Sequence, residues 1–325
     1  MATKTPLPPT PPELTLDEIL ARFATDEQAR LYLEAVRWQN GRYCPHCGNA
    51  DESKIYAIAA NSATEVRPGL YDCGACRQQF TVTVGTIFHG AKLGLRIWLA
   101  AFYLLCSSKK GFSALQLQRS FNIGSYRTAW LMLHKIRYAM KDSLVVEKMT
   151  GIVEADETYV GARNKRGTKR GRPGPDSHKT PVVSLVQRGG KVRSQVMMNV
   201  TGKNLKAALR EHVDPSATLM TDEYSVYTKP GREFAGHETV NHGNEEYVRG
   251  NVHVNTAEGF FSLLKRGING VYHHVSRQHL NQYLGEFDFR YNARTMTDGE
   301  RIIAGIRKAE GKRMMLYRPT SQRVS

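Results

Sequence analysis

The sequence has no apolar run long enough to cross a membrane. Its most apolar stretch, IWLAAFYLLC at residues 97–106, has ten residues, about half of the ~20 that a membrane-spanning helix needs. The first residues, MATKTPLPPTPPEL, are rich in proline and lack the apolar segment of a signal peptide. We therefore expect no membrane association and a cytoplasmic location.

Acidic residues are scarce relative to basic ones. The 325 residues include 46 Lys and Arg against 30 Asp and Glu, which gives a formal net charge of +16. This excess predicts a polyanionic partner, with nucleic acid favoured over an acidic membrane surface. The length suggests about two or three domains, and hydrophobic residues, 41% of the chain, are sufficient for a core.

Cysteine is also scarce, with five residues in the chain, which argues against a disulfide framework in a cytoplasmic protein. Four of them form two C-x-x-C pairs, in YCPHCG and YDCGACRQQF, separated by 25 residues. Two such pairs can supply four thiolates to one tetrahedral zinc and leave no open position for chemistry. The expected structural zinc ligands are Cys44, Cys47, Cys73 and Cys76. His46 is expected to be exposed, and Cys106 to be an ordinary core residue.

Helical spacing of apolar residues predicts helices over residues 14–38, with Asp17 and Asp26 in first turns, and one buried helix over residues 92–108. Short strands, such as QFTVTVG, are expected around the cysteine pairs.

Residues 111–140 predict two helices joined by a short turn, FNIGS, with Ser113 and Ser125 as their N-caps. This is the helix-turn-helix pattern of many DNA-binding proteins. The apolar stripe of the second helix consists of Ala129, Leu133, Ile136 and Met140. Its expected exposed face consists of Tyr126, Arg127, Thr128, His134, Lys135 and Arg137. DNA contacts are expected from Tyr126, Arg127 and Lys135.

From residue 150 onward the pattern changes to strands, beginning with GIVEADETYVGAR at residues 151–163. Alternation places Glu154 and Asp156 on one face of this strand and Glu157 on the other. Solvated acids that protect an edge strand from mispairing are one explanation. Residues 182–200 then predict a hairpin with Gly189 and Gly190 in its turn, and a short helix follows.

In residues 218–227, TLMTDEYSVY, an apolar strand runs into Asp222 and Glu223. A strand that ends in acidic residues therefore occurs twice. Edge protection would not need this repetition. A third acid, Glu258, lies on a helix that Asn255 is expected to cap, with Ser262 and Lys265 near it on the polar side. The alternative role for Glu258 is structural, as the second residue of a capping box with Asn255.

This order of elements is the one that a ribonuclease-H-like core needs to gather three carboxylates at one end of its sheet. The domains expected are an N-terminal leader with helices (1–38), a zinc ribbon (39–90), a helix-turn-helix domain (91–148), an α/β ribonuclease-H-like catalytic domain (149–295) and a C-terminal tail (296–325).

Several segments carry a resemblance to a known family, namely VEADETYVG, LMTDEYSVY, HVNTAEGFFSLLKRGINGVYHHVS and YLGEFDFRYNAR. With CPHCG, the second cysteine pair and SALQLQRSFNIGSYRTAWLMLHKIR, they resemble the DDE transposases of bacterial insertion sequences. The similarity is to the ISXO-type group with an N-terminal zinc ribbon, and it runs from about residue 15 to residue 295.

The resemblance implies that Asp156, Asp222 and Glu258 are the catalytic triad, with Lys265 as an accompanying basic residue. Three carboxylates without nearby thiolate or imidazole ligands suit Mg²⁺ or Mn²⁺. Lys265 lies about 10 Å beyond Glu258 along a helix axis, which suits contact with a flanking phosphate. The roles of Glu154, Glu157 and Glu223 stay open.

The implied activity is that of a transposase that binds terminal inverted repeats, cleaves the element ends and joins the 3′ ends to target DNA, as a homo-oligomer on DNA. One alternative is a zinc-ribbon transcription regulator whose acids only shape a binding domain. A second alternative is a nuclease that hydrolyses DNA without joining it.

The segment ARNKRGTKRGRPGPDSHKT, residues 162–180, carries seven Lys or Arg against one Asp. It has no apolar period, so we expect it to be disordered without DNA and to hold the phosphate backbone without reading sequence. A merely solubilising loop is the alternative. The residues expected to contact DNA are Arg166, Lys169, Arg170 and Arg172.

Overall fold

The computed structural model describes residues 15–142, 147–161 and 179–314. The chain divides into two compact units. The helical unit combines residues from 1–108, 112–140 and 295–325, and the sheet unit combines 109–111 with 141–294. Within the described residues, no helix has both the length and the apolar character that crossing a membrane requires.

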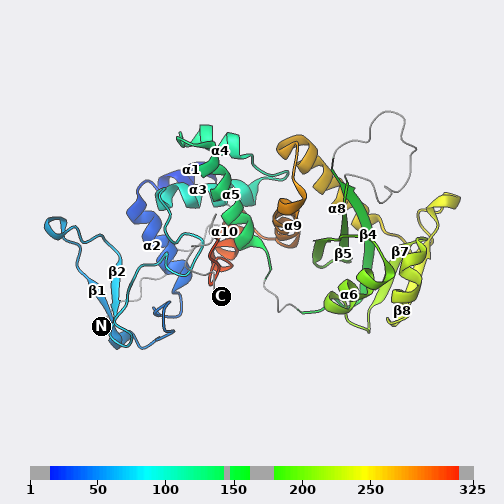
Figure 1. Cartoon of the computed structure of the whole chain (residues 1–325), viewed down its shortest axis with the longest axis horizontal. Helices are drawn as coiled ribbons and strands as arrows, with labels where there is room; N and C mark the ends of the chain where they lie inside the picture. The colour runs from blue at the N-terminus through cyan, green and yellow to red at the C-terminus, as the bar shows by residue number, and fades with distance from the viewer. Residues whose placement is uncertain (1–14, 143–146, 162–178, 315–325) are drawn as a thin grey trace, which may run out of the picture. The chain divides into compact units, whose positions relative to one another are not determined.

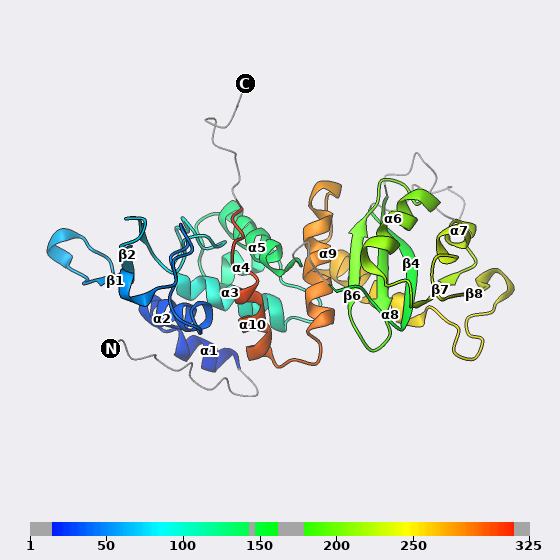
Figure 2. The ribbon, with the colours of Figure 1, turned by 90° about the horizontal axis from the view of Figure 1, so that it is seen from below.

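The helical unit contains helices from both ends of the chain (Figures 1 and 2). They are α1 (Leu16–Arg22), α2 (Asp26–Arg37), α3 (Leu95–Ser107), α4 (Ala114–Ser120), α5 (Tyr126–Met140) and α10 (Asp298–Arg307). The predicted helices over residues 14–38 and 92–108 are confirmed, and Asp17 and Asp26 lie in first turns. Residues 298–307, expected within a C-terminal tail, form α10, which packs on α2, α3 and α5.

Three short antiparallel strands form a small sheet in the helical unit: β1 (Ile55–Ile58), β2 (Leu70–Cys73) and β3 (Gln79–Phe80). The strand expected over residues 79–85 ends at Phe80 because the chain turns there. In that turn the Val84 N–H donates to the Thr81 carbonyl at 3.1 Å, and the Thr81 and Thr83 hydroxyls bond at 2.9 Å.

The sheet unit contains a mixed five-stranded sheet with the order β6-β5-β4-β7-β8. Its strands are β4 (Ile152–Val160), β5 (Thr180–Gln187), β6 (Val192–Val196), β7 (Thr218–Asp222) and β8 (Gly236–Val240). The first three strands in sequence pair antiparallel, whereas β7 pairs parallel with both β4 and β8. The predicted hairpin is β5–β6, and Gly189 in its turn has a φ of 69° that favours glycine.

Helices cover both faces of this sheet. They are α6 (Gly202–His212), α7 (Thr228–Gly231), α8 (Asn255–Gly267) and α9 (Arg277–Asn292), and five residues in π conformation, Ile268–Tyr272, follow α8. On one face, Val182 and Val186 of β5 pack in one cluster with Phe260 and Leu264 of α8. On the other, Val153 and Ala155 of β4 pack with residues of α6. Figure 1 shows α6 and α8 beside the sheet.

Strand β4 is the central strand of the sheet, with β5 on one side and β7 on the other. Edge protection is therefore the wrong explanation for its acids. The predicted alternation is confirmed, because Glu154 contacts α8 on one face while Glu157 contacts Tyr227 on the other.

Replacing Leu264 with Ala should lower the free energy of unfolding of the sheet unit by about 2–5 kcal/mol, because Leu264 is fully buried between α8 and the sheet. Urea unfolding followed by circular dichroism measures the loss. The control is Leu263→Ala, one residue earlier and only half-buried, which should cost clearly less. Equal losses for the two variants would contradict the described packing of α8.

Candidate functional site

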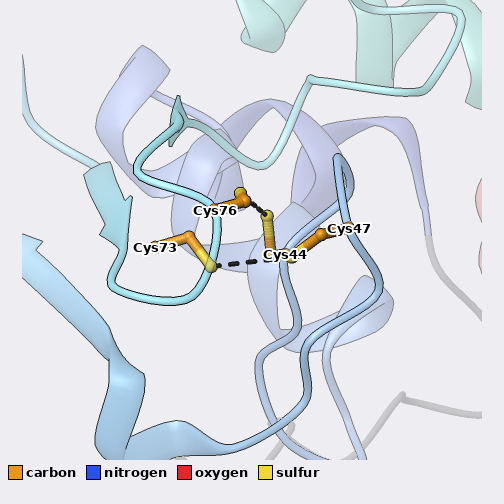
Figure 3. A group of neighbouring side chains, drawn as sticks. All are labelled: Cys44, Cys47, Cys73 and Cys76. Carbon is orange, nitrogen blue, oxygen red and sulfur yellow. Dashed lines mark hydrogen bonds between the residues drawn. The ribbon is translucent and has the colours of Figure 1, made fainter.

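The four paired cysteines lie together in the helical unit, on two loops that face each other (Figure 3). The Sγ atoms of Cys44 and Cys76 are 3.7 Å apart, as are those of Cys47 and Cys73. All four sulfur atoms lie within 4.8 Å of one another. A tetrahedral zinc with bonds of about 2.3 Å places its sulfur ligands about 3.8 Å apart. The cluster therefore fits a structural zinc.

Backbone N–H groups favour the ionised form of one thiol in this cluster, which is the form that binds a metal. Hydrogen bonds from the N–H groups of Cys76 and Ala75 lower the pKa of the Cys73 thiol to about 7. Burial raises the pKa of Cys44 instead, so a cation is needed to keep all four sulfurs ionised. As predicted, His46 is exposed and Cys106 is buried away from the cluster.

In the sheet unit, strand pairing brings two of the predicted acids level with each other. The parallel register of β4 and β7 pairs Glu154 with Met220, and two residues farther along each strand are Asp156 and Asp222. Residues at equivalent positions of neighbouring parallel strands point to the same face. Strand β7 ends at Asp222, whose carboxylate accepts the N–H of Tyr224 at 3.1 Å.

The third acid, Glu258, lies in the first turn of α8, which covers that face of the sheet. The expectation that Asn255 caps this helix is wrong, because Val254 occupies the N-cap position and makes no side-chain capping bond. Asn255 is the first helical residue instead. The capping-box explanation of Glu258 therefore lacks its partner, and Glu258 is exposed, with its Oε1 4.0 Å from Nδ1 of His242.

A cavity of about 820 Å³ opens between β4 and α8, and it is lined by both acidic and basic groups. Asp156, Glu157 and Glu258 supply the acids. The basic side chains are Lys110, Lys265 and Arg266. Asp222 is not among the lining residues, but its charge acts on Asp156.

The environment of Asp156 raises the pKa of this carboxyl to about 7. Burial is the largest cause, and repulsion from Glu157, Asp222 and Glu258 adds to it, while a hydrogen bond from the Glu157 N–H acts in the opposite direction. The neighbouring acids are thus close enough to Asp156 to oppose its ionisation, a condition that a bound cation would relieve.

Glu154, Glu157 and Glu223, to which the sequence assigned no role, each accept hydrogen bonds from a specific partner. Glu154 is fully buried and accepts hydrogen bonds from the start of α8. The Tyr227 hydroxyl donates to Glu157 at 3.0 Å, and the His242 N–H donates to Glu223 at 3.0 Å. Sequence reasoning missed Arg188, which binds Glu154 at 2.6 Å. Its position next to the Gly189-Gly190 turn gave no local signal of this contact.

The predicted exposed face of α5 is only partly exposed. Tyr126, Arg127 and Thr128 are exposed, and Lys135 is half-buried, with Nζ 5.9 Å from the centroid of the Trp98 ring. His134 and Arg137 are buried, so their assignment to the exposed face is wrong. The buried face of α5 is wider than its stripe of apolar residues, and the side chains of His134 and Arg137 form the rest of that face. The basic residues Arg166, Lys169, Arg170 and Arg172 lie outside the described residues.

Family models match two parts of the chain. Residues 148–292 match the ISXO2-like transposase domain, and residues 24–79 match the transposase zinc-ribbon domain. Over these residues the chain is similar to insertion-sequence transposases. The first match contains all three predicted acids and Lys265, and the second contains all four zinc-binding candidates. These domain families imply a DNA-cleaving transposase with a zinc ribbon.

One relative of this chain is an uncharacterized protein in transposable element ISH50 of Halobacterium salinarum. It is 29% identical over 287 residues, which are 82% of this chain and 91% of the relative. A chain from the cryo-electron microscopy structure of a simian T-cell lymphotropic virus intasome, in complex with PP2A regulatory subunit B56 gamma, aligns at 12% identity. The alignment covers 55% of this chain and 61% of that chain, with a TM-score of 0.26.

Cys44→Ser or Cys73→Ser should release zinc from the protein and unfold the small sheet of the ribbon, because such a domain depends on its ion for folding. Zinc per chain, measured by atomic emission, should fall below that of the wild type. The control is Cys106→Ser, which alters a buried cysteine outside the cluster and should leave the zinc content unchanged. A folded Cys44→Ser chain with one bound zinc would contradict the four-cysteine site.

Proposed function

We propose that this chain binds the terminal inverted repeats of an insertion sequence, cleaves the element ends and transfers the 3′ ends to target DNA. The observation that carries the proposal is the placement of three acids on one face of the sheet. Asp156 of β4 and Glu258 of α8 line one cavity, and Asp222 ends β7, the strand that pairs parallel with β4.

The sheet supports a ribonuclease-H-like core. Such a core combines three antiparallel strands with parallel strands added next to the first one, which is the order β6-β5-β4-β7-β8 seen here. The first and central strand then carries one acid, and the next parallel strand carries the second at its end. The sequence order of Asp156, Asp222 and Glu258 follows this scheme.

The donor set fits a hard divalent cation, Mg²⁺ or Mn²⁺, because all three side chains offer carboxylate oxygens. Asp156, Asp222 and Glu258 would hold it. Two such ions, when bound, would supply activation of the attacking water or 3′-hydroxyl and stabilisation of the leaving oxygen. Burial and the repulsion from neighbouring acids raise the pKa of Asp156, which supports this assignment, because a bound cation would favour the charged form of that carboxyl.

Basic side chains around the acids support a polynucleotide substrate. Lys265 lines both the main cavity and a second one of about 450 Å³, which Lys179 and His273 also line. A DNA strand that passes from one cavity to the other would meet Lys265 at the junction, where its ammonium would neutralise a phosphate next to the scissile one.

DNA recognition is assigned to the helical unit. Helices α4 and α5 support the helix-turn-helix interpretation, with Ser113 as the N-cap of α4 and a short turn before Tyr126. A cavity of about 340 Å³ at the start of α5 is lined by Lys92, Arg127 and Lys135, among others. Positive side chains at a helix N-terminus suit a phosphate of the DNA backbone. We further propose that the protein acts as a homo-oligomer on DNA.

Glu258→Gln tests the proposed function. Gln is nearly isosteric, and Glu258 makes no capping bond, so the melting temperature without metal should not change. Cleavage of a duplex that carries the element ends should fall at least 100-fold with Mg²⁺ if catalysis uses this carboxylate. Asp156→Asn and Asp222→Asn should behave alike, and all three variants should still bind the ends.

The control for this experiment is Glu245→Gln, which neutralises an exposed acid in the loop before α8 and should cut normally. Wild-type activity in Glu258→Gln would refute the triad. A wild-type chain that binds the ends without cutting would favour the transcription regulator, and one that cuts without joining 3′ ends would favour the nuclease.

A second experiment concerns the basic segment that follows β4. Replacing Arg166, Lys169, Arg170 and Arg172 together with Gln removes four positive charges. Binding should weaken equally for all DNA sequences, and the slope of log affinity against log salt should flatten by about 3–4, since each phosphate contact contributes about 0.9. Fluorescence anisotropy over a salt series measures this slope. An unchanged slope would mean that the segment does not hold DNA.

A further inference from the structure

One buried carboxylate joins the strand that carries Asp156 to the helix that carries Glu258. Glu154 lies two residues before Asp156 on the same face of β4, and it is fully buried. Its Oε2 accepts the backbone N–H of Thr256 at 2.8 Å and that of Ala257 at 3.0 Å. Its Oε1 accepts the Thr256 hydroxyl at 2.9 Å and Nε of Arg188 at 2.6 Å. These bonds offset the cost of burying the charge.

Two of these bonds satisfy amides in the first turn of α8, which have no partner within the helix. Capping groups normally come from the residue just before a helix, but Val254 provides none here. The cap comes instead from a strand 102 residues away in sequence. The positive end of the helix dipole adds to its attraction for the carboxylate.

Arg188 extends this contact to the chain that leads into α8. Its Nη1 donates to the carbonyl and side-chain oxygens of Asn251 at 2.7 and 2.8 Å, and its Nη2 donates to the His253 carbonyl at 2.9 Å. The same guanidinium therefore holds both Glu154 and the residues before the helix. The start of α8 is fixed relative to β4 from two sides.

We propose that Glu154, assisted by Arg188, is a positioning residue that sets the carboxylate of Glu258 against that of Asp156. Glu258 directly follows Ala257, whose N–H binds Glu154, so any shift of the first turn of α8 moves Glu258. This inference rests on the proposed function, because it takes Asp156 and Glu258 as ligands of the divalent cation. Glu154 itself touches neither the cation nor DNA in this assignment.

Glu154→Gln in the full-length chain tests the proposal. Partners that orient metal ligands typically contribute 10–100-fold to metal affinity. Mn²⁺ binding, measured by electron paramagnetic resonance, should therefore weaken by about 10–100-fold. Amide hydrogen exchange at Thr256 and Ala257 should accelerate. In cleavage, kcat should fall while the KM for DNA stays the same.

Glu286→Gln is the matched control. Glu286 is also fully buried in the sheet unit, pairs with Arg290 at 2.7 Å and accepts the Tyr272 hydroxyl at 2.6 Å. Its neutralisation removes an equivalent buried charge from α9 without touching the cap of α8. It should lower the melting temperature while leaving Mn²⁺ affinity unchanged. Equal effects of both variants on Mn²⁺ affinity would overturn the proposal.

Two further variants separate position from charge and from folding. Glu154→Asp keeps the charge but shortens the side chain by one methylene, so it should also weaken Mn²⁺ binding, and a wild-type affinity would overturn the proposal. Thr256→Ala removes only the hydrogen bond from the Thr256 hydroxyl to Glu154. It replaces Glu154→Gln as the test if that variant does not fold. It should weaken Mn²⁺ binding by a smaller factor, and an unchanged affinity would overturn the proposal.

The wild-type chain separates failure of this inference from failure of the proposed function. A wild-type chain that binds no Mn²⁺ through Asp156 would refute both the proposed function and the positioning role of Glu154. A wild type that binds Mn²⁺ and cuts DNA, beside a Glu154→Gln variant that does the same with equal affinity, would remove the inference alone.

Discussion

The parallel pairing of β4 with β7 is the constraint on which the carboxylate site depends. It puts Asp156 and Asp222 level on neighbouring strands, and the antiparallel pairing of β5 on the other side makes β4 central. A slip of one residue in this pairing would turn one of the two acids to the opposite face. The buried valines of β4 and β5 on both faces oppose such a slip, because it would expose them.

The same pairing places acids inside a strongly basic protein. Burial and neighbouring carboxylates raise the pKa of Asp156, which makes its charge unfavourable for folding, yet the basic groups of Lys110, Lys265 and Arg266 line the same cavity. This mixture suits a substrate that is itself a polyanion. The acids alone would repel such a polyanion, and the lysine and arginine side chains beside them counter that repulsion.

Much of this arrangement could be predicted from the sequence, because it depends on local patterns. Period-two alternation placed Glu154 and Asp156 correctly on one face, and the spacing of the cysteine pairs predicted their cluster. The cap of α8 could not be predicted, since it comes from a residue far away in sequence. The burial of His134 and Arg137 was missed for a similar reason: helical position shows which side chains share a face, but not how wide the packed face is.

The helical unit is discontinuous in sequence, and this affects how the protein is made. Its last helix, α10, follows the whole sheet unit, and Glu310 just beyond it forms a two-bond pair with Arg37 of α2, at 2.6 and 2.8 Å. Lys312 also donates to the carbonyl of Ala139 in α5. Domains usually fold in order of synthesis, but here the ribosome must deliver the final residues before the first unit is complete. A chain that stops after α9 would therefore leave the N-terminal helices without part of their own core.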